Sequence, residues 1–419
     1  MQPDSAIAFA MQPIVAERTY QFVPPYRGNF WPGFLKLFVG RFLARSFGVT
    51  EVEIRDAHRL EALLESGRSV LLTANHSRMA DPLVLEMLSK RVRRHFYIMA
   101  SSHLFYRGRF QAWVLRRAGA FSVHREGVDR EAVNAAVDIL AEGTRPLVIF
   151  PEGCLSHAND RLNALMPGVS FIARTAARRV EKRSDGHSAG QVVALPVAIK
   201  YLFHGDLERT VLPMLEEIER RLSWRPQRQL TLYERIYKLG HALLTVKELE
   251  YFEAAQNGEL HERTSRLSDH ILGPLESKWL ERPSDGSVIS RVKELRKAVL
   301  PGIIEGDLSR DEREGRWRDL EDMYLAQQLS LYPPRYVASR PTADRILETV
   351  ERFAEDLTDD EQVHGPTTAV VQLGEPVEVE SRRRRDADGD PVLRAIEEQL
   401  ETMLEKLASE SRIHDDGSK

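Results

Sequence analysis

Hydrophobic and polar positions follow two different rhythms between about residues 49 and 201. Short, continuous apolar runs are followed by segments in which apolar residues recur every three or four positions. The apolar runs are SVLLTA (69–74), HFYIMA (95–100), PLVIF (146–150) and VVALPVAIKY (192–201), and the periodic segments include PLVLEMLSK (82–90), REAVNAAVDILAEG (130–143) and GVSFIARTAARRV (168–180). Strands that alternate with helices are typical of βαβ units. The pattern therefore predicts an α/β fold, with a mostly parallel sheet flanked by helices.

The pattern changes after Gly205. Charged, helix-like segments such as LERTVLPMLEEIERRL (207–222) and ADRILETVERFAEDL (343–357) predominate, and strand character returns only in TTAVVQLGEPVEVE (367–380). A large helical insertion before the last strand explains this order. We expect an N-terminal segment at 1–48, an α/β core at 49–205, the insertion at 206–365, the returning strand at 366–380, and a charged linker with a C-terminal helix at 381–419. Three roles stay open for the insertion: a lid, a homodimer surface or a site for another partner.

The N-terminal segment contains one strongly aromatic stretch, FWPGFLKLFVGRFLARSF (30–47). Its apolar residues recur at helical spacing, and its cations fall elsewhere: the apolar set is Trp31, Phe34, Leu35, Phe38 and Phe42, and the cations are Lys36 and Arg41. Such a helix can lie in a lipid interface with its cations near the headgroups, or it can pack on its own domain. No apolar run approaches the roughly 18 to 20 residues that cross a bilayer, and the N-terminus lacks signal-peptide features. We therefore expect peripheral membrane contact.

The composition limits the partners. The chain has a net charge of -4 and 29% charged residues, so nothing indicates attraction to nucleic acid. Cys154 is the only cysteine, which excludes an internal disulfide framework and a cysteine-rich metal site. No His, Cys and carboxylate cluster has the spacing of metal ligands, so we expect no metal. A single cysteine fits a reducing compartment, and the cytoplasm is the default.

A histidine and a carboxylate follow the first fully apolar run, in NHSRMADP (75–82). A residue before proline avoids the helical region and proline suits the first helical turn, so Asp81 should cap a helix that begins at Pro82. The short path back to His76 can bring the carboxylate to one ring nitrogen, which fixes the tautomer and leaves the other nitrogen to take a proton. The pair predicts a general base and the residue that orients it; a surface loop or a simple helix cap is the alternative.

A second loop, in PLVIFPEGCLS (146–156), also follows a buried run. In an open α/β sheet, ligands bind beyond the carboxyl ends of the strands, so both loops should emerge at one edge and can form one site. Gly153 permits a turn whose N–H groups could hold an oxyanion or an anionic group. Glu152 could orient the acceptor or the loop, or it could simply accept backbone hydrogen bonds.

These motifs resemble those of a known family. NHSRMAD has the spacing of the N-H-x-x-x-x-D block, and FPEGCLS resembles the F-P-E-G-T-R-S block, of the glycerolipid acyltransferases, which include lysophosphatidate and glycerol-phosphate acyltransferases. GAFSVHR (119–125) resembles the family's glycine-to-arginine block, ALPVAIK (194–200) its proline-containing strand, and VVQLGEPV (370–377) its closing strand. The resemblance covers about 49–201 and the returning strand, and it leaves the helical insertion outside.

The resemblance implies transfer of an acyl group from acyl-CoA or an acyl carrier protein, as co-substrate, to a hydroxyl of a glycerolipid or lysophospholipid. His76 would act as general base with Asp81 as its partner, without an acyl-enzyme and without a further cofactor. The residues that would shape the acceptor and oxyanion side are Asn75, Arg125, Glu152, Gly153 and Ser156. The protein would then be a peripheral, cytoplasm-facing membrane enzyme that makes or remodels glycerolipids.

Two departures from the family pattern concern the acceptor. Cys154-Leu155 stands where glycerol-phosphate binders usually have threonine and arginine, and Ser101 falls where a lysine is often found. An arginine–phosphate hydrogen bond contributes about 1.5–3 kcal/mol, so its replacement by leucine should weaken phosphate binding roughly tenfold or more. The side chains that could compensate are Arg78, His124, Arg125, Arg161 and Lys200. The acceptor therefore stays open between lysophospholipids, alcohols and amine-bearing lipids.

Three other functions compete with this interpretation. GHSAG (186–190) fits the G-x-S-x-G pattern of serine hydrolases, but that elbow needs a strand before it and a helix after it, and here a strand follows. Cys154 could be a nucleophile, although it occupies the position of a small hydroxyl residue in the family. A lipid-binding or scaffolding module on the same fold would not require His76, Asp81 and the FPEG turn, all of which are present.

Overall fold

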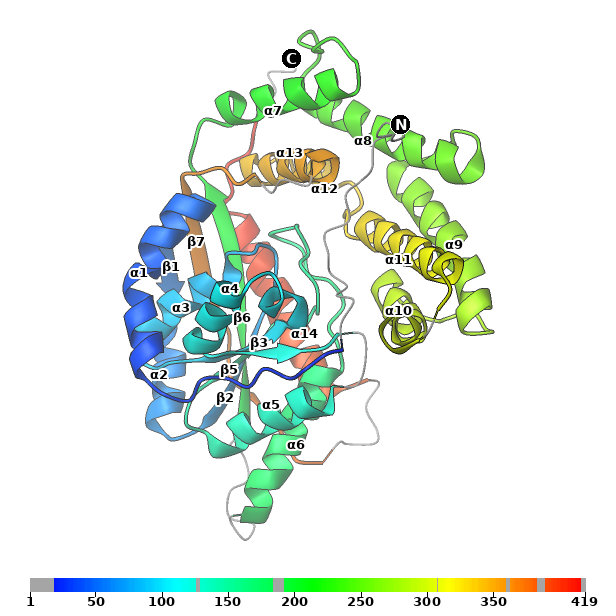
Figure 1. Ribbon diagram of the computed structural model, residues 1–419. Coiled ribbons are helices and arrows are strands. Elements are labelled where there is room, and N and C mark those ends of the chain that lie inside the picture. The colour runs from blue at the N-terminus through cyan, green and yellow to red at the C-terminus, as the bar shows by residue number, and fades with distance from the viewer. Residues whose placement is uncertain are drawn as a thin grey trace. The chain divides into compact units, whose positions relative to one another are not determined.

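The computed structural model describes residues 19–125, 129–183, 192–306, 308–358, 362–382 and 389–415 (Figure 1). The chain divides into two compact units. The sheet unit contains the described residues of 20–204 and 364–411, and the helical unit contains Thr19 and the described residues of 205–363 and from 412 onward. The insertion expected from the sequence was 206–365. The GHSAG segment lies outside the described residues, as do residues 383–385 of the RRRR run.

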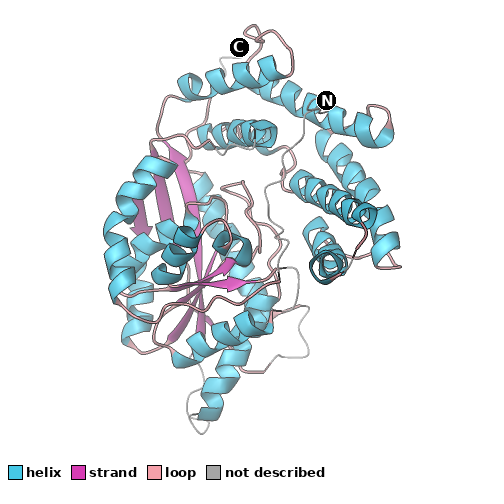
Figure 2. Ribbon diagram, in the orientation of Figure 1, coloured by secondary structure: helices cyan, strands magenta, loops and turns pink. Residues whose placement is uncertain are grey.

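The sheet unit is built on one eight-stranded sheet with the order β1-β7-β6-β2-β5-β3-β4 and β8 beside β6. The strands are β1 (Val49–Arg55), β2 (Ser69–Ala74), β3 (Tyr97–Ser101), β4 (Ala120–Val123), β5 (Leu147–Ile149), β6 (Val192–Phe203), β7 (Thr367–Leu373) and β8 (Val377–Glu378). Only β6 pairs antiparallel with its neighbours β7 and β8; the other pairs are parallel. The predicted fold class, a mostly parallel sheet flanked by helices, is confirmed, and β7 is the returning strand (Figure 2).

Helices cover both faces of this sheet, so residues of the central strands are buried on both sides. The helices of this unit are α1 (Phe30–Phe47), α2 (Ala57–Glu65), α3 (Asp81–Arg91), α4 (Arg109–Ala118), α5 (Arg130–Glu142), α6 (Gly168–Arg183) and α14 (Pro391–Ala408), with a short 3₁₀ turn η1 (Ser102–Phe105). In β2, Leu71 packs with residues of α5, α6 and α14, whereas Val70 and Leu72 pack with α1, α2 and α3. Two apolar cores therefore hold the sheet rigidly between two helical layers.

The α1 helix departs from one expectation. Lys36 was expected on a polar face, but it is buried, with Nζ at 2.8 Å from Nδ1 of His95 and in hydrogen-bond contact with Ser89. Glu86 of α3 lies 3.6 Å from the same nitrogen, and burial raises the pKa of Glu86 to about 7. The face of α1 with Pro32, Val39 and Leu43 packs inward, which leaves most of the aromatic side chains of this helix exposed.

The helical unit is formed by α7 (Leu207–Arg221), α8 (Leu232–Phe252), α9 (Leu260–Trp279), α10 (Val288–Glu305), α11 (Arg310–Ser330), α12 (Tyr336–Ser339) and α13 (Ala343–Thr358). Residues of α8 to α11 share an apolar core, and buried ion pairs such as Arg263–Glu248 and Arg235–Glu219 join neighbouring helices. Within the described residues of the whole chain, no helix is both long and apolar enough to cross a membrane.

Candidate active site

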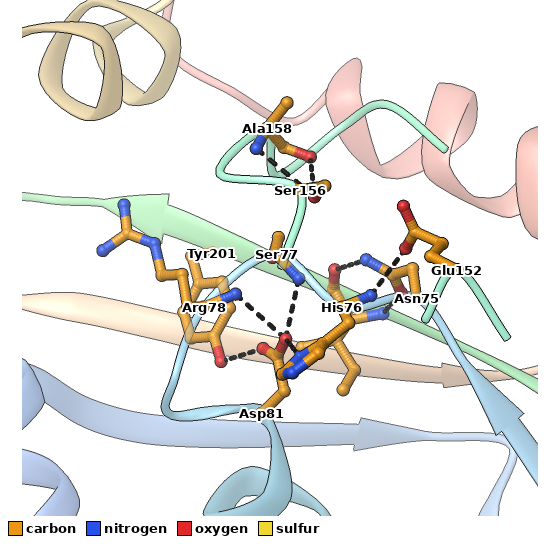
Figure 3. A network of polar contacts seen from close by, with 10 residues as sticks. Asn75, His76, Ser77, Arg78, Asp81, Glu152, Ser156, Ala158 and Tyr201 are labelled. Carbon is orange, nitrogen blue, oxygen red and sulfur yellow. Dashed lines mark hydrogen bonds and ion pairs between the residues drawn. The ribbon is translucent and has the colours of Figure 1, made fainter. Parts of the chain in front are cut away.

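The loop after β2 holds His76 and Asp81 against each other. Nδ1 of His76 lies 2.8 Å from Oδ2 of Asp81, which also accepts the backbone N–H groups of Ser77 (2.8 Å) and Arg78 (3.0 Å) (Figure 3). Asp81 is fully buried, and the His76 side chain is 13% exposed. A carboxylate that already accepts two backbone donors orients the imidazole so that Nδ1 carries the hydrogen and Nε2 can accept a proton.

Asp81 does not cap α3 as predicted. The helix begins at Asp81 itself, with Ala80 at the N-cap position and Pro82 in the first turn. The carboxylate turns back toward the loop and binds Ser77 and Arg78 rather than the free N–H groups of its own helix. Asp81 therefore closes the loop around His76, which gives the residue a role in the shape of the site in addition to its contact with the imidazole.

The loop after β5 meets the loop after β2 at His76, as the common sheet edge predicted. Glu152 accepts the backbone N–H of His76 at 2.8 Å, and the backbone N–H of Ser156 donates to the carbonyl of His76 at 2.8 Å. The ring of Phe150 stacks on the imidazole with 4.1 Å between centroids. Residues of the second loop thus hold both the N–H and the carbonyl of His76 and pack against its ring. Figure 3 shows the contact of Glu152 with the backbone of His76.

Glu152 is fully buried and serves as an internal acceptor. Its second oxygen accepts the backbone N–H of Asn163 at 3.0 Å, so the carboxyl joins two segments of the site. Burial raises the pKa of Glu152 to about 8, the two backbone hydrogen bonds oppose that shift, and the charge of Asp81 adds to it. The structure thus places Glu152 against the backbone and not toward open space.

Gly153 and Ser156 shape the second loop. Gly153 has φ +70°, and a Cβ there would lie 2.3 Å from Sδ of Met166, so a larger residue is strained at this turn. Its N–H was expected to point outward, but it donates to the carbonyl of Phe150 at 3.2 Å. The Ser156 hydroxyl donates to the carbonyl of Ala158 at 3.2 Å. Both residues build the turn that contacts His76.

Asn75 does not point toward a substrate position. Its side-chain amide pairs with β6: Nδ2 donates to the carbonyl of Ile199 at 3.0 Å, and Oδ1 accepts its N–H at 2.7 Å. Asn159 makes the same pair of bonds to Tyr201, at 3.1 and 2.7 Å, which the sequence did not indicate. Because β2 pairs with β6 only as far as Val197, these amides take over the hydrogen bonding of β6 where β2 ends.

Arg125 follows β4, and among the described residues the structure does not bring it into contact with the His76–Asp81 pair. It is close to His103, which follows β3 and whose Nδ1 lies 2.8 Å from the hydroxyl of Ser101. Burial, together with the positive charges of Arg125 and Arg107, lowers the pKa of His103 to about 3. The structure therefore groups Arg125 with the ends of β3 and β4, near Ser101.

Two residues in contact with the pair were missed. Tyr201 of β6 donates its hydroxyl to Oδ1 of Asp81 at 2.5 Å, and Phe150 stacks on His76. Phe150 directly precedes the FPEG turn, so its position was a usable signal, whereas Tyr201 lies more than one hundred residues along the chain from Asp81. In the part of the chain that the structure describes, no three His, Cys, Asp or Glu side chains are grouped to hold a metal ion.

Comparison with known proteins agrees with this geometry. Residues 51–200 match the family model described as Acyltransferase, a range that contains both loops that meet at His76. This match and the similar protein described next support a glycerolipid acyltransferase family for this part of the chain.

One similar protein is the 1-acyl-sn-glycerol-3-phosphate acyltransferase of Streptococcus pneumoniae (strain ATCC BAA-255 / R6), which is 28% identical over 123 residues. The matched residues are 29% of this chain and 44% of that protein, so the chain spans less than half the length of this relative.

Proposed function

We propose that the sheet unit transfers an acyl group from the thioester of acyl-CoA or an acyl carrier protein to a hydroxyl of a glycerolipid or lysophospholipid. The observation that carries this proposal is the buried His76–Asp81 contact of 2.8 Å, with Nε2 of His76 bonded to none of the described residues. A base with one nitrogen fixed and the other open is suited to removing a hydroxyl proton.

The reaction then needs no covalent enzyme intermediate. As Nε2 of His76 takes the proton, the acceptor oxygen attacks the thioester carbonyl, the C–O bond forms, the C–S bond breaks and the thiolate leaves. The proton on His76 returns to that thiolate, so the enzyme ends in its starting state. Asp81 stabilises the imidazolium that exists between the two proton transfers. Glu152, Gly153, Ser156 and Asn75 would act by holding the loops in place.

The acceptor is proposed more broadly than the name of the relative. A phosphate-bearing acceptor would find Cys154 and Leu155 where the family pattern has a threonine and an arginine. Arg125 would supply positive charge to such an acceptor, beside a His103 that stays neutral at pH 7 because burial and nearby cations hold its pKa low. We therefore favour a glycerolipid or lysophospholipid, and expect a phosphate monoester to bind roughly tenfold more weakly than in proteins with the arginine.

The test uses labelled acyl-CoA, a mixture of lysolipids, and two histidine variants. His76→Ala should lower acyl-lipid formation by at least about 100-fold, because it removes the general base. The matched control is His58→Ala: His58 also has a carboxylate neighbour, Asp56 at 4.0 Å, but its side chain is 73% exposed and lies on α2. Acyl-lipid products are identified by mass spectrometry, and thiol release is followed in parallel.

The proposal fails if the wild-type protein makes no acyl-lipid, or if His76→Ala makes it as fast as wild type. A lipid-binding or scaffolding module is then the better account, and it predicts lipid binding that is the same in the wild-type protein and in His76→Ala.

A membrane surface is proposed as the place where this acceptor is met. Exposed apolar side chains of α1 continue onto α4 through the contact of Trp31 with Trp113, whose ring centroids are 4.8 Å apart. Phe30, Phe38 and Phe110 expose 67%, 54% and 78% of their surface. We name this set the α1–α4 aromatic surface; its members are Phe30, Trp31, Phe34, Leu37, Phe38, Phe42, Phe110 and Trp113.

Cations accompany these rings. Arg117 of α4 lies 4.6 to 5.9 Å from the ring centroids of Tyr26, Trp31 and Trp113, and Arg41, Arg45, Arg109 and Arg116 are on the same two helices. Exposed aromatics with arginines beside them suit the boundary between acyl chains and anionic headgroups. A single isolated exposed apolar residue would need no such explanation, but a continuous group on two helices does.

Vesicle sedimentation tests this surface. Phe38→Ser and Phe110→Ser should each weaken binding to vesicles of phosphatidylcholine and phosphatidylglycerol by roughly tenfold, from the apolar area they no longer bury. Phe171→Ser is the matched control, because Phe171 of α6 is 59% exposed and outside the surface. Equal binding by all three variants and the wild type would reject the surface as the docking site.

A further inference from the structure

We propose that Tyr201 is a positioning residue for the reaction: its hydroxyl holds the free oxygen of Asp81, and so fixes the carboxylate that orients His76. Oδ1 of Asp81 accepts the Tyr201 hydroxyl at 2.5 Å, while Oδ2 accepts His76 and two backbone N–H groups. Figure 3 shows the tyrosine reaching the carboxylate from the side opposite the imidazole. This inference rests on the proposed function for its kinetic consequences, but not for its geometry.

A buried carboxylate needs a donor at each oxygen. Asp81 is fully buried, so water cannot replace a missing hydrogen bond, and an unpaired oxygen of an anion is destabilised. Burial and the neighbouring charge of Asp81 raise the pKa of Tyr201 well above its usual value, so the hydroxyl keeps its proton at any working pH. Tyr201 therefore supplies Oδ1 with a constant donor.

The backbone of Tyr201 is itself held in place. Tyr201 lies on β6 beyond Val197, the last residue that pairs with β2. The Asn159 amide accepts the N–H of Tyr201 at 2.7 Å and donates to its carbonyl at 3.1 Å. On its other edge, β6 pairs with β7 at Ala369. Loop and strand thus fix the main chain of Tyr201, and its ring has little freedom to move away from Asp81.

The ring is also enclosed. The guanidinium of Arg78 lies 5.1 Å from its centroid, and the N–H of Arg78 donates to Asp81. The loop after β2 and the strand β6 are therefore joined at one carboxylate, and the loop that contains Asn159 holds the backbone of the tyrosine that reaches it. A sequence motif that places His76 and Asp81 five residues apart fixes their proximity, but the side chain from β6 sets the rotation of the carboxylate.

The expected effect follows from the loss of one hydrogen bond. Tyr201→Phe keeps the ring and removes the donor, so more negative charge stays on Asp81 and the His76–Asp81 pair takes up a proton at higher pH. The acid limb of the activity profile should move upward by about one pH unit, and kcat should fall roughly tenfold, as expected for one charge-assisted hydrogen bond. KM should be unchanged, because Tyr201 contacts Asp81 and not the substrate.

Among the described residues, the charged and titratable groups beside Asp81 are His76, Arg78, Glu152 and Tyr201. The Tyr201→Phe substitution changes only the last of them. The matched control is Tyr336→Phe. Tyr336 is also buried and donates its hydroxyl to a buried carboxylate, Glu348, within the helical unit. Both variants should lower thermal stability by a similar amount, and only Tyr201→Phe should move the acid limb.

Two measurements keep the inference testable. In the first, pH profiles of kcat and kcat/KM compare wild type, Tyr201→Phe and Tyr336→Phe; an unchanged acid limb in Tyr201→Phe overturns the proposal. In the second, NMR follows the titration of the His76 ring in the same proteins, with His76→Ala used to assign the signal.

The NMR measurement does not depend on turnover. If the wild-type protein transfers no acyl group, the proposed function fails, yet an upward shift of the His76 titration in Tyr201→Phe still supports the positioning role. If the protein is active but the titration stays where it was, the positioning role fails and the proposed function stands.

Discussion

Replacing Glu152 by glutamine is the most direct test of how the two loops are joined. The carboxyl of Glu152 accepts two backbone N–H groups, from His76 at 2.8 Å and from Asn163 at 3.0 Å. Glutamine has nearly the same shape, but only one of its terminal atoms can accept a hydrogen bond. Its NH₂ group would face one of the two N–H donors, so either His76 or Asn163 loses its partner.

The magnitude follows from that one lost bond in a buried place. A buried donor without a partner costs about 1–3 kcal/mol. If the loss falls on His76, the imidazole shifts relative to the thioester, and a rate change of roughly 5- to 150-fold corresponds to the same free energy. The effect should appear in kcat more than in KM, because the glutamate contacts the backbone of the base and not a substrate.

The stability of this variant should also depend on pH with a definite sign. Because burial raises the pKa of Glu152 to about 8, its stabilising contribution is fully present below about pH 4.5, its ordinary range, and is lost as the pH rises through about 8. Glutamine cannot titrate. The free-energy difference between wild type and Glu152→Gln should therefore be largest at or below about pH 4.5, smaller at pH 6 and smallest near pH 9.

The assay combines kinetics with denaturant unfolding at pH 6 and pH 9. Glu86→Gln is the control, because Glu86 is also buried, with a pKa raised to about 7, but it contacts Lys36 of α1. It should change the pH dependence of stability while kcat stays near wild type. If Glu152→Gln keeps kcat within about twofold and unfolds like wild type at pH 6, the carboxyl does not join the loops and the reasoning is refuted.

Three further predictions concern residues around the site. Asn75→Leu leaves the N–H and the carbonyl of Ile199 without partners. The free energy of unfolding, measured by urea titration, should therefore fall by roughly 2–5 kcal/mol. A loss below about 1 kcal/mol, the value of one exposed hydrogen bond, would contradict this. Gly153→Ala should lower the free energy of unfolding by about 1–2 kcal/mol for its φ of +70° alone. Adding Met166→Ala in the same chain should remove only the clash between the new Cβ and the Met166 side chain, as measured by thermal unfolding and activity. Arg174→Met removes the ion-pair partner of Asp390 at the start of α14. Burial alone would raise the pKa of Asp390, but hydrogen bonds from Arg174 and Ser170 outweigh burial and hold this pKa well below its usual range. The pair's contribution of roughly 3 kcal/mol should be present above about pH 4 and vanish as the pH falls through the lowered pKa, so wild type and variant should converge in acid.

Much of the fold could be predicted from the spacing of apolar residues and from the order of the strand-like and helix-like segments along the chain. The apolar runs at 69–74 and 146–150 became β2 and β5, and their common direction explains why the loops after them meet. The returning strand was also expected, because an alternating segment after a long helical stretch has few other places to pair. Its exact neighbours were not predicted: β7 lies between β1 and β6 and is antiparallel to β6, which depends on register and on how the chain returns.

The details that failed depend on contacts between distant residues. Helical spacing in α1 showed one aromatic face but not which side of the helix is covered, so Lys36 was assigned to a polar face although it is buried. The Gly153 amide was expected to be open, but the turn closes it onto Phe150. Tyr201 could not be found from local pattern, because its role exists only where β6 runs past the end of β2 and the first residue of α3 lies over it.

The pairing of β6 with β7 has a consequence for folding. Phe203 and Thr367 are direct partners, and the N–H of His204 donates to the carbonyl of Pro366, so a short turn would suffice to connect these strands. The antiparallel pair of β6 and β7 therefore resembles a β-hairpin in which the helical unit takes the place of the connecting loop. Closing a flexible loop of roughly 160 residues instead of about 4 costs some 3 kcal/mol more in chain entropy. If the helical unit folds first and its ends come together, that entropy is already spent, and the order of synthesis, which produces α7 to α13 before β7 appears, favours that sequence of events.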